Sequence, residues 1–231
     1  MNMPITLNRY QLAFSLVEMA IVLTIVGLLM ATLLPSLTAQ IEQQRRTEAK
    51  KQLAEIQQAL MGFAVMNGRL PCPTTEPNPN SASYGMEAGS CNSDPTAEGY
   101  LPWKTLGVAE TDPWGTPRNA SGSPWNGYWR YRVDRNFSSS FGLSTNFHSN
   151  DALTIKNSAG NTLTSSSERP IAIVFSTGPD LIPNGQNASF ESGGTPGIYE
   201  SDVPNGNYDD ILVWLSRPQL MNRMVAAGKL P

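Results

Sequence analysis

The sequence predicts an α+β protein in which a long N-terminal helix, apolar in its first half and amphipathic in its second, packs on an antiparallel β-sheet head with long loops. Three observations support this prediction: an apolar run near the N-terminus, apolar residues at helical spacing after it, and a remainder rich in Gly, Pro, Asn and Ser. The 231 residues contain 16 Lys and Arg against 19 Asp and Glu. Because nucleic-acid binding needs clustered cationic residues, nucleic acid is not an expected partner.

The apolar run from Phe14 to Leu34 contains Glu18 as its single charged residue. At 1.5 Å per residue it forms about 31 Å of helix, enough for a bilayer core of about 30 Å. We therefore predict a transmembrane helix over residues 14–35. A cleaved secretory signal is an alternative, but its apolar region is usually about 7 to 15 residues long and lacks a carboxylate.

The residues around Glu18 resemble a known processing signal. Ala13 and Phe14 are followed by a serine, two aliphatic residues and Glu18, and Pro35 lies 17 residues further along. The pattern is similar to the class III signal of type IV pilins and type II secretion pseudopilins. The resemblance implies a pilin-like fold, a prepilin leader over residues 1–13 that is cleaved after Ala13, and methylation of the new N-terminus at Phe14. Glycine is the commoner residue before the cut, so Ala13 departs from the pattern.

The same resemblance assigns assembly roles to Phe14, Glu18 and Pro35. The new amino group of Phe14 is a cation in an apolar setting, and Glu18 of a neighbouring subunit supplies the opposite charge. Pro35 occupies the place of the helix-kinking proline in pilins. The implied partners are other pilin or pseudopilin subunits, a prepilin peptidase and an inner-membrane assembly platform. The implied location is the bacterial inner membrane with a periplasmic head, and then a filament in the periplasm or outside the cell.

The basic residues around the apolar run favour the opposite orientation. Arg9 precedes the run, whereas Arg45, Arg46, Lys50 and Lys51 follow it. By the positive-inside rule alone, the C-terminal part would lie in the cytoplasm. We give more weight to the processing signal, because a dedicated peptidase reads it on the cytoplasmic face.

Beyond Pro35, apolar residues recur every three or four positions and predict an amphipathic helix over residues 36–67. Its stripe from Leu53 to Phe63 is expected to pack on a β-rich head over residues 68–231. The apolar positions are Leu37, Ile41, Leu53, Ile56, Leu60, Phe63 and Ala64. The expected strands are Tyr128–Val133, Ala152–Ile155, Ile171–Phe175 and Ile211–Leu215. A short helix from Pro218 to Gly228 is expected to present Leu220, Met224 and Val225 on one face.

The first expected strand alternates between two faces. Trp129, Tyr131 and Val133 share the face expected in the core, whereas Arg130 and Arg132 lie on the other. A nucleic-acid surface is one interpretation of these arginines. A solvated sheet face explains them better, because half-buried strands alternate in this way.

Cys72 and Cys91 are the only cysteines. In an exported head they are expected to form a disulfide that stabilises the fold by about 3 kcal/mol. A redox thiol pair is the alternative, but the C-x-x-C spacing is absent. With His148 as the single histidine and no G-x-S-x-G element, a zinc centre or a serine hydrolase is hard to build, so the chain is not expected to be an enzyme.

Residues 180–210 contain six acidic residues and no Lys or Arg. Such a loop suits a hard cation such as Ca²⁺, although an ordinary solvated acidic loop has the same composition. The motifs Gly99-Tyr100-Leu101-Pro102, Asp112-Pro113-Trp114-Gly115 and Phe175-Ser176-Thr177-Gly178-Pro179-Asp180 resemble the head of the major type II secretion pseudopilin, in which a loop between the last two strands holds calcium. The resemblance implies calcium as a cofactor, with Asp180, Asp209 and Asp210 as ligands. The loop here is far longer, and residues 137–169 are an extra segment.

Two functions are compatible with these observations. The first is a structural subunit, a minor pilin or pseudopilin, of a type IV pilus or type II secretion filament. The second is a single-span, membrane-anchored periplasmic binding protein that does not polymerise. The length and insertions of the head favour a minor subunit over a compact major one.

Overall fold

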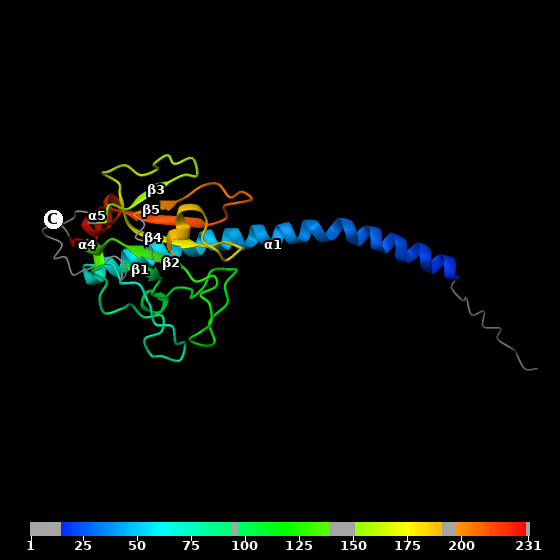
Figure 1. Ribbon diagram of the computed structural model, residues 1–231, viewed down its shortest axis with the longest axis horizontal. Helices are drawn as coiled ribbons and strands as arrows, with labels where there is room; N and C mark the ends of the chain where they lie inside the picture. The colour runs from blue at the N-terminus through cyan, green and yellow to red at the C-terminus, as the bar shows by residue number, and fades with distance from the viewer. Residues whose placement is uncertain (1–14, 94–96, 139–150, 191–196, 230–231) are drawn as a thin grey trace, which may run out of the picture. The chain divides into compact units, whose positions relative to one another are not determined.

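The computed structural model describes residues 15–93, 97–138, 151–190 and 197–229, with the backbone alone for residues 31–37. The chain divides into two compact units, Met1–Gln44 and Arg45–Pro231. The second unit contains the strands that the structure describes and the C-terminal part of the long helix (Figure 1).

Helix α1 spans Leu16–Asn67 and is the long N-terminal helix that the sequence predicts. Beyond residue 40 its sequence is rich in Gln, Glu, Lys, Arg, Ala and Leu, which have high helix propensity. The helix ends where Gly68 adopts a left-handed backbone with φ +67° and donates its N–H to the carbonyl of Ala64 at 2.8 Å. The helix therefore ends at Asn67, the last residue of the predicted amphipathic helix.

The apolar stripe of α1 packs into the head as predicted. Leu53, Ile56, Leu60 and Ala64 are at most 1 % exposed and belong to the main core. Each fully buried leucine or isoleucine stabilises the fold by roughly 1.5–3 kcal/mol. Phe63 is only half-buried, at the edge of this stripe.

Four strands in the described ranges form an antiparallel sheet in the order β1-β2-β4-β6. They are β1 (Glu98–Tyr100), β2 (Arg130–Val133), β4 (Pro170–Ser176) and β6 (Ile211–Ser216). The last three confirm expected strands to within two residues, whereas the sequence does not predict β1. All seven residues of β4 are buried, as expected for a β-branched and aromatic strand covered on both faces.

A second layer covers the face of this sheet opposite α1. In it, β3 (Thr154–Lys156) pairs in parallel with β5 (Ile198–Glu200), and Figure 1 shows the two strands side by side. Apolar residues of this layer and of the main sheet form one cluster: Leu153, Ile155 and Tyr199 from the layer, and Ile173, Phe175 and Leu212 from β4 and β6. The expected strand at Ala152–Ile155 begins later, because Ala152 has φ +53°, which no strand can use.

This covered face overturns one prediction. Arg130 and Arg132, expected in solvent, are each only 3 % exposed. Arg132 pairs with Asp151 at 3.0 Å, and Arg130 donates to the carbonyl oxygens of Trp125 at 3.0 Å and Tyr128 at 2.8 Å. The prediction is wrong because the β3–β5 layer and the loop that contains Trp125 cover the face that the alternation assigns to water.

Helix α5 (Arg217–Ala226) confirms the predicted C-terminal helix. Ser216 and Gln219 form a reciprocal capping box at its start, and Leu220 and Met224 lie in the main core. Val225, expected on the same face, is 51 % exposed, because five helical residues turn it about 140° away from Leu220. The short helices are α3 (Trp103–Leu106), α4 (Arg135–Ser138) and the 3₁₀ helix η1 (Gly185–Phe190).

Candidate functional site

The N-terminal part of α1 is apolar on every face. Its large apolar side chains from Leu16 to Met30 are 42–88 % exposed. Thr24, a polar residue among them, satisfies its own hydroxyl by donating to the carbonyl of Ala20 at 2.7 Å. A helix that is apolar all round is normally covered by lipid or by other protein. This segment is therefore an element that needs a partner.

A membrane crossing is not confirmed. Within the part of the chain that the structure describes, no helix combines the length and the apolarity that a crossing requires. Phe14, at the start of the predicted span, lies outside the described residues, and Pro35 lies within α1.

Glu18 lies in the first turn of α1 and closes a capping box. Its Oε2 accepts the N–H of Ser15 at 3.1 Å, and Oγ of Ser15 accepts the N–H of Val17 at 3.2 Å. This reciprocal pair satisfies N–H groups that the helix cannot bond internally. Within one chain, Glu18 therefore stabilises the first turn of its own helix. The predicted cut between Ala13 and Phe14 lies outside the described residues.

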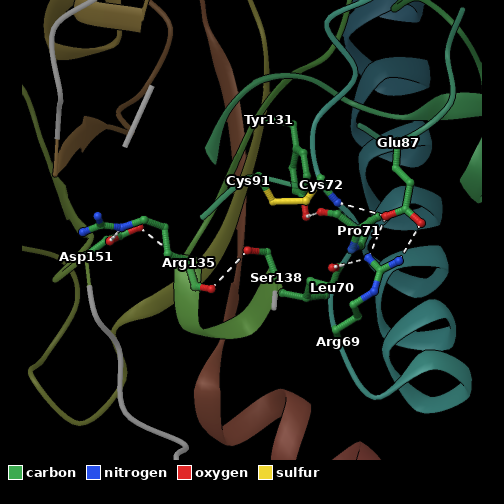
Figure 2. Close-up of a disulfide and its surroundings, with 10 residues drawn as sticks. All are labelled: Arg69, Leu70, Pro71, Cys72, Glu87, Cys91, Tyr131, Arg135, Ser138 and Asp151. Carbon is green, nitrogen blue, oxygen red and sulfur yellow. Dashed lines mark hydrogen bonds and ion pairs between the residues drawn. A yellow bond between two sulfur atoms is a disulfide. The ribbon is translucent and has the colours of Figure 1, made fainter. Parts of the chain in front are cut away.

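The disulfide between Cys72 and Cys91 is present, with Cα atoms 5.6 Å apart and both residues buried. Glu87 accepts the N–H of Cys72 at 3.2 Å and forms a bidentate ion pair with Arg69 at 2.6 and 2.7 Å (Figure 2). The hydroxyl of Tyr131, from β2, donates to the carbonyl of Pro71 at 3.0 Å. The bridge is therefore held by charge-assisted and core contacts, as a structural disulfide is.

A cavity of about 370 Å³ lies beside the disulfide and is lined in part by Arg69, Glu87 and Ser138. Arg69 and Glu87 already satisfy each other, and this pairing raises the pKa of Arg69. Among the described residues that line it, the cavity therefore offers a ligand no uncompensated charge.

Replacing Cys72 and Cys91 together by alanine is expected to lower the free energy of unfolding by about 2–5 kcal/mol, because the unfolded chain gains conformational freedom. Chemical denaturation of both proteins checks the loss. A non-reducing peptide map of the wild type should contain one cross-linked peptide, and two free thiols there would contradict the assignment.

The three aspartates predicted as calcium ligands do gather in one place, around Asn184. The N–H of Asn184 donates to Oδ2 of Asp210 at 2.9 Å, and its Oδ1 accepts the N–H of Asp209 at 2.9 Å. Its Nδ2 donates to Oδ2 of Asp180 at 3.3 Å. Asp180 and Asp209 are also linked directly, since the N–H of Asp180 donates to Oδ2 of Asp209 at 3.4 Å.

The electrostatics of this cluster favour neutral carboxyls. Burial raises the pKa of Asp210 to about 7, with smaller contributions from the negative charges of Asp209 and Asp180 and opposition from the amides of Asn184 and Asn187. Burial and the charge of Asp180 also raise the pKa of Asp209, which Arg46 partly offsets.

The arrangement does not fit a bound cation. Calcium takes about six to eight oxygen ligands. Across the described ranges, no group of three His, Cys, Asp or Glu side chains is placed to hold a metal ion. Oδ1 of Asp209 and Oδ1 of Asp210 are buried without a hydrogen-bond partner in the described structure, but two such oxygens are too few.

Sequence reasoning missed Asn187 in this loop, and it included Glu200 only among the six acidic residues. Asn187 is fully buried and Glu200 is 7 % exposed. No motif marks either residue, because their contacts come from the pairing of β5 with β3 and from the position of η1. A turn-rich sequence of this kind does not reveal which of its amides point inward.

The head is expected to lose stability as the pH rises from about 4 to about 7. The folded state binds a proton at Asp210 up to about pH 7, whereas an unfolded aspartate releases it near 3.9. Within that window the folded state binds more protons, so a rise in pH favours unfolding, by a few kcal/mol at about 1.4 kcal/mol per pKa unit. Denaturation midpoints across this range check the slope, and Asp210→Asn should flatten it. An equal slope in both proteins would contradict the assignment.

Comparison with known proteins identifies the N-terminal segment alone. Residues 8–34 match the family described as the prokaryotic N-terminal methylation motif. No curated protein and no solved structure matches the chain. A class III signal implies processing by a prepilin peptidase and assembly with pilin subunits in general. The chain therefore carries, over residues 8–34, the class III signal of type IV pilins and pseudopilins, which supports a pilin-like or pseudopilin-like protein.

Proposed function

We propose that the chain is a minor structural subunit of a type IV pilus or type II secretion filament. The match of residues 8–34 to the methylation motif carries this proposal. It is supported by α1, whose N-terminal part exposes apolar side chains on every face while its C-terminal part is fixed in the core of the head. A helix of this design joins a folded head to an apolar assembly.

In this proposal a prepilin peptidase removes residues 1–13, Phe14 is methylated, and the subunit enters the filament from an inner-membrane assembly platform. The carboxylate of Glu18 then exchanges its local contact with Ser15 for the amino group of Phe14 in a neighbouring subunit. Charge pairing in an apolar setting removes two uncompensated charges at once. The head lies in the periplasm, and the filament lies there or outside the cell.

The second layer of the head supports a minor rather than a major role. A subunit repeated along a filament needs only a compact head, whereas β3, β5 and the long connections around them add bulk over one face of the sheet.

Shearing filaments from cells that express a tagged chain tests the proposal. The chain is expected in the sheared fraction, in substoichiometric amount, and only when the prepilin peptidase is present. Confinement to the membrane fraction, with or without the peptidase, would favour an anchored binding protein and contradict a filament role.

A further inference from the structure

The loop that connects β4 to β6 is closed by side-chain amides. Residues 177–210 carry four carboxylates whose oxygens or backbone groups meet the same two asparagines: Asp180, Glu200, Asp209 and Asp210. When Asp180, Asp209 and Asp210 are ionised, their mutual repulsion disfavours an ordered loop unless something compensates it.

Asn187 supplies the central part of that compensation. Its Nδ2 donates to Oδ2 of Asp210 at 2.8 Å and to the carbonyl of Glu200 at 3.0 Å, while its Oδ1 accepts the N–H of Glu200 at 2.8 Å. One fully buried side chain thus joins η1, β5 and the residue that precedes β6. The hydroxyl of Tyr208 also donates to the carbonyl of Glu200, at 2.7 Å, and completes the arrangement.

Asn184 compensates the three aspartates, because it forms hydrogen bonds with Asp180, Asp209 and Asp210 at once. Glu200 receives a further N–H, from Gln186 at 3.0 Å. This approach requires a glycine at position 185, where φ is +51° and a Cβ would lie 2.1 Å from Oε2 of Glu200. The backbone of the loop is therefore shaped to bring N–H groups to the carboxylates.

A cation and these amides compete for Oδ2 of Asp180 and Oδ2 of Asp210, whereas Oδ1 of Asp209 and of Asp210 has no hydrogen-bond partner in the described structure. A cation accepts electron density from oxygen, as an N–H group does, so each carboxylate oxygen that holds two N–H groups is less available to a metal. Oδ2 of Asp210 receives N–H groups from both Asn184 and Asn187, and Oδ1 of each asparagine already accepts a backbone N–H.

We propose that Asn184 and Asn187 form an amide clamp that holds residues 177–190 and 197–210 of this loop together without a bound cation. The clamp replaces calcium, which the resemblance of the sequence to the major pseudopilin head implies. The order of the loop is then a property of the chain alone and does not follow the calcium concentration around it. This inference concerns the head and does not depend on the filament role.

Thermal unfolding of the full-length chain in detergent, in EDTA and in excess calcium, tests the clamp. The midpoint of thermal unfolding of the wild type is expected to be the same in EDTA and in excess calcium. Asn187→Ala is expected to lower this midpoint by roughly 5 °C, because the buried side chain and its hydrogen bonds to Glu200 and Asp210 are lost. Asn187→Asp removes the N–H donors and adds a carboxylate. Its midpoint of thermal unfolding is expected to be lower than that of the wild type in EDTA and to rise when calcium is added.

Asn80→Asp is the matched control, since Asn80 is exposed and lies in a different loop, and its midpoint should equal that of the wild type. A wild-type midpoint that rises with calcium and falls in EDTA would overturn the proposal. The same conclusion would follow if Asn187→Ala were as stable as the wild type. If either Asn187 variant does not fold, the two wild-type measurements still decide between clamp and cation.

Discussion

Glu18→Ala is expected to remove the chain almost completely from filaments while leaving cleavage after Ala13 largely intact. In the proposed assembly, the carboxylate of Glu18 is the counter-charge for the amino group of Phe14 in a neighbouring subunit. Without it, an unpaired cation remains in an apolar setting, at a cost of about 2.5–3.5 kcal/mol or more for each subunit contact. Immunoblots of sheared filaments and of membranes measure both incorporation and cleavage.

The capping box makes a sharper comparison possible, because Glu18 also accepts the N–H of Ser15. Glu18→Gln keeps an acceptor for that N–H but has no charge. Ser15→Ala removes the other half of the box, the acceptor of the Val17 N–H, and leaves the carboxylate in place. If charge pairing drives assembly, Glu18→Gln fails as Glu18→Ala does, and Ser15→Ala assembles with a loss of about 1 kcal/mol in helix stability. Wild-type incorporation of Glu18→Gln would contradict the pairing.

Asp151→Ala is expected to lower the free energy of unfolding of the head by about 3–5 kcal/mol. The side chain of Asp151 is 1 % exposed and pairs with Arg132, whose side chain is 3 % exposed, and with Arg135 from α4. Figure 2 shows the carboxylate of Asp151 beside Arg135. Arg135 is partly exposed and can turn to water, but Arg132 lies between the main sheet and the β3–β5 layer. Removing Asp151 therefore takes a buried carboxylate away from a buried cation.

Tryptophan fluorescence in denaturant measures this loss, since all five tryptophans lie in the head. Glu55→Ala is the matched control, because it breaks an exposed pair with Lys51 at 3.8 Å and should cost less than about 1 kcal/mol. Arg132→Met combined with Asp151→Ala should recover much of the loss, because both charges of the buried pair are then removed. A loss for Asp151→Ala no larger than that for Glu55→Ala would contradict the account of the covered face.

Local patterns predicted the elements whose contacts are set by their own sequence. The spacing of Leu53, Ile56 and Leu60 is sufficient to predict a buried helical stripe, and the run from Pro170 to Ser176 is sufficient to predict a central strand. The end of α1 follows from the glycine at position 68. These signals need no knowledge of the rest of the chain.

Contacts between distant segments could not be predicted in this way. Alternation in β2 correctly separates Tyr131 from Arg132, but it does not reveal that a second layer buries the arginine. That layer depends on the parallel pairing of Ile155 with Tyr199, two residues that β4 separates in the sequence. Asn187 was missed for the same reason, since its partners lie 13 to 23 residues away in the sequence. Of the candidate assembly residues, Glu18 is placed by the structure, and Ala13 and Phe14 lie outside its described residues.

The mass of the N-terminal tryptic peptide tests the central claim most directly. Arg9 and Arg45 are the basic residues that flank the signal, so trypsin separates two outcomes cleanly. We expect a peptide from Phe14 to Arg45, heavier by one methyl group, in cells that contain a prepilin peptidase, and a peptide from Tyr10 to Arg45 in cells that lack it. A peptide from Tyr10 to Arg45 in both strains, or a cut beyond the apolar run, would contradict a processed filament subunit.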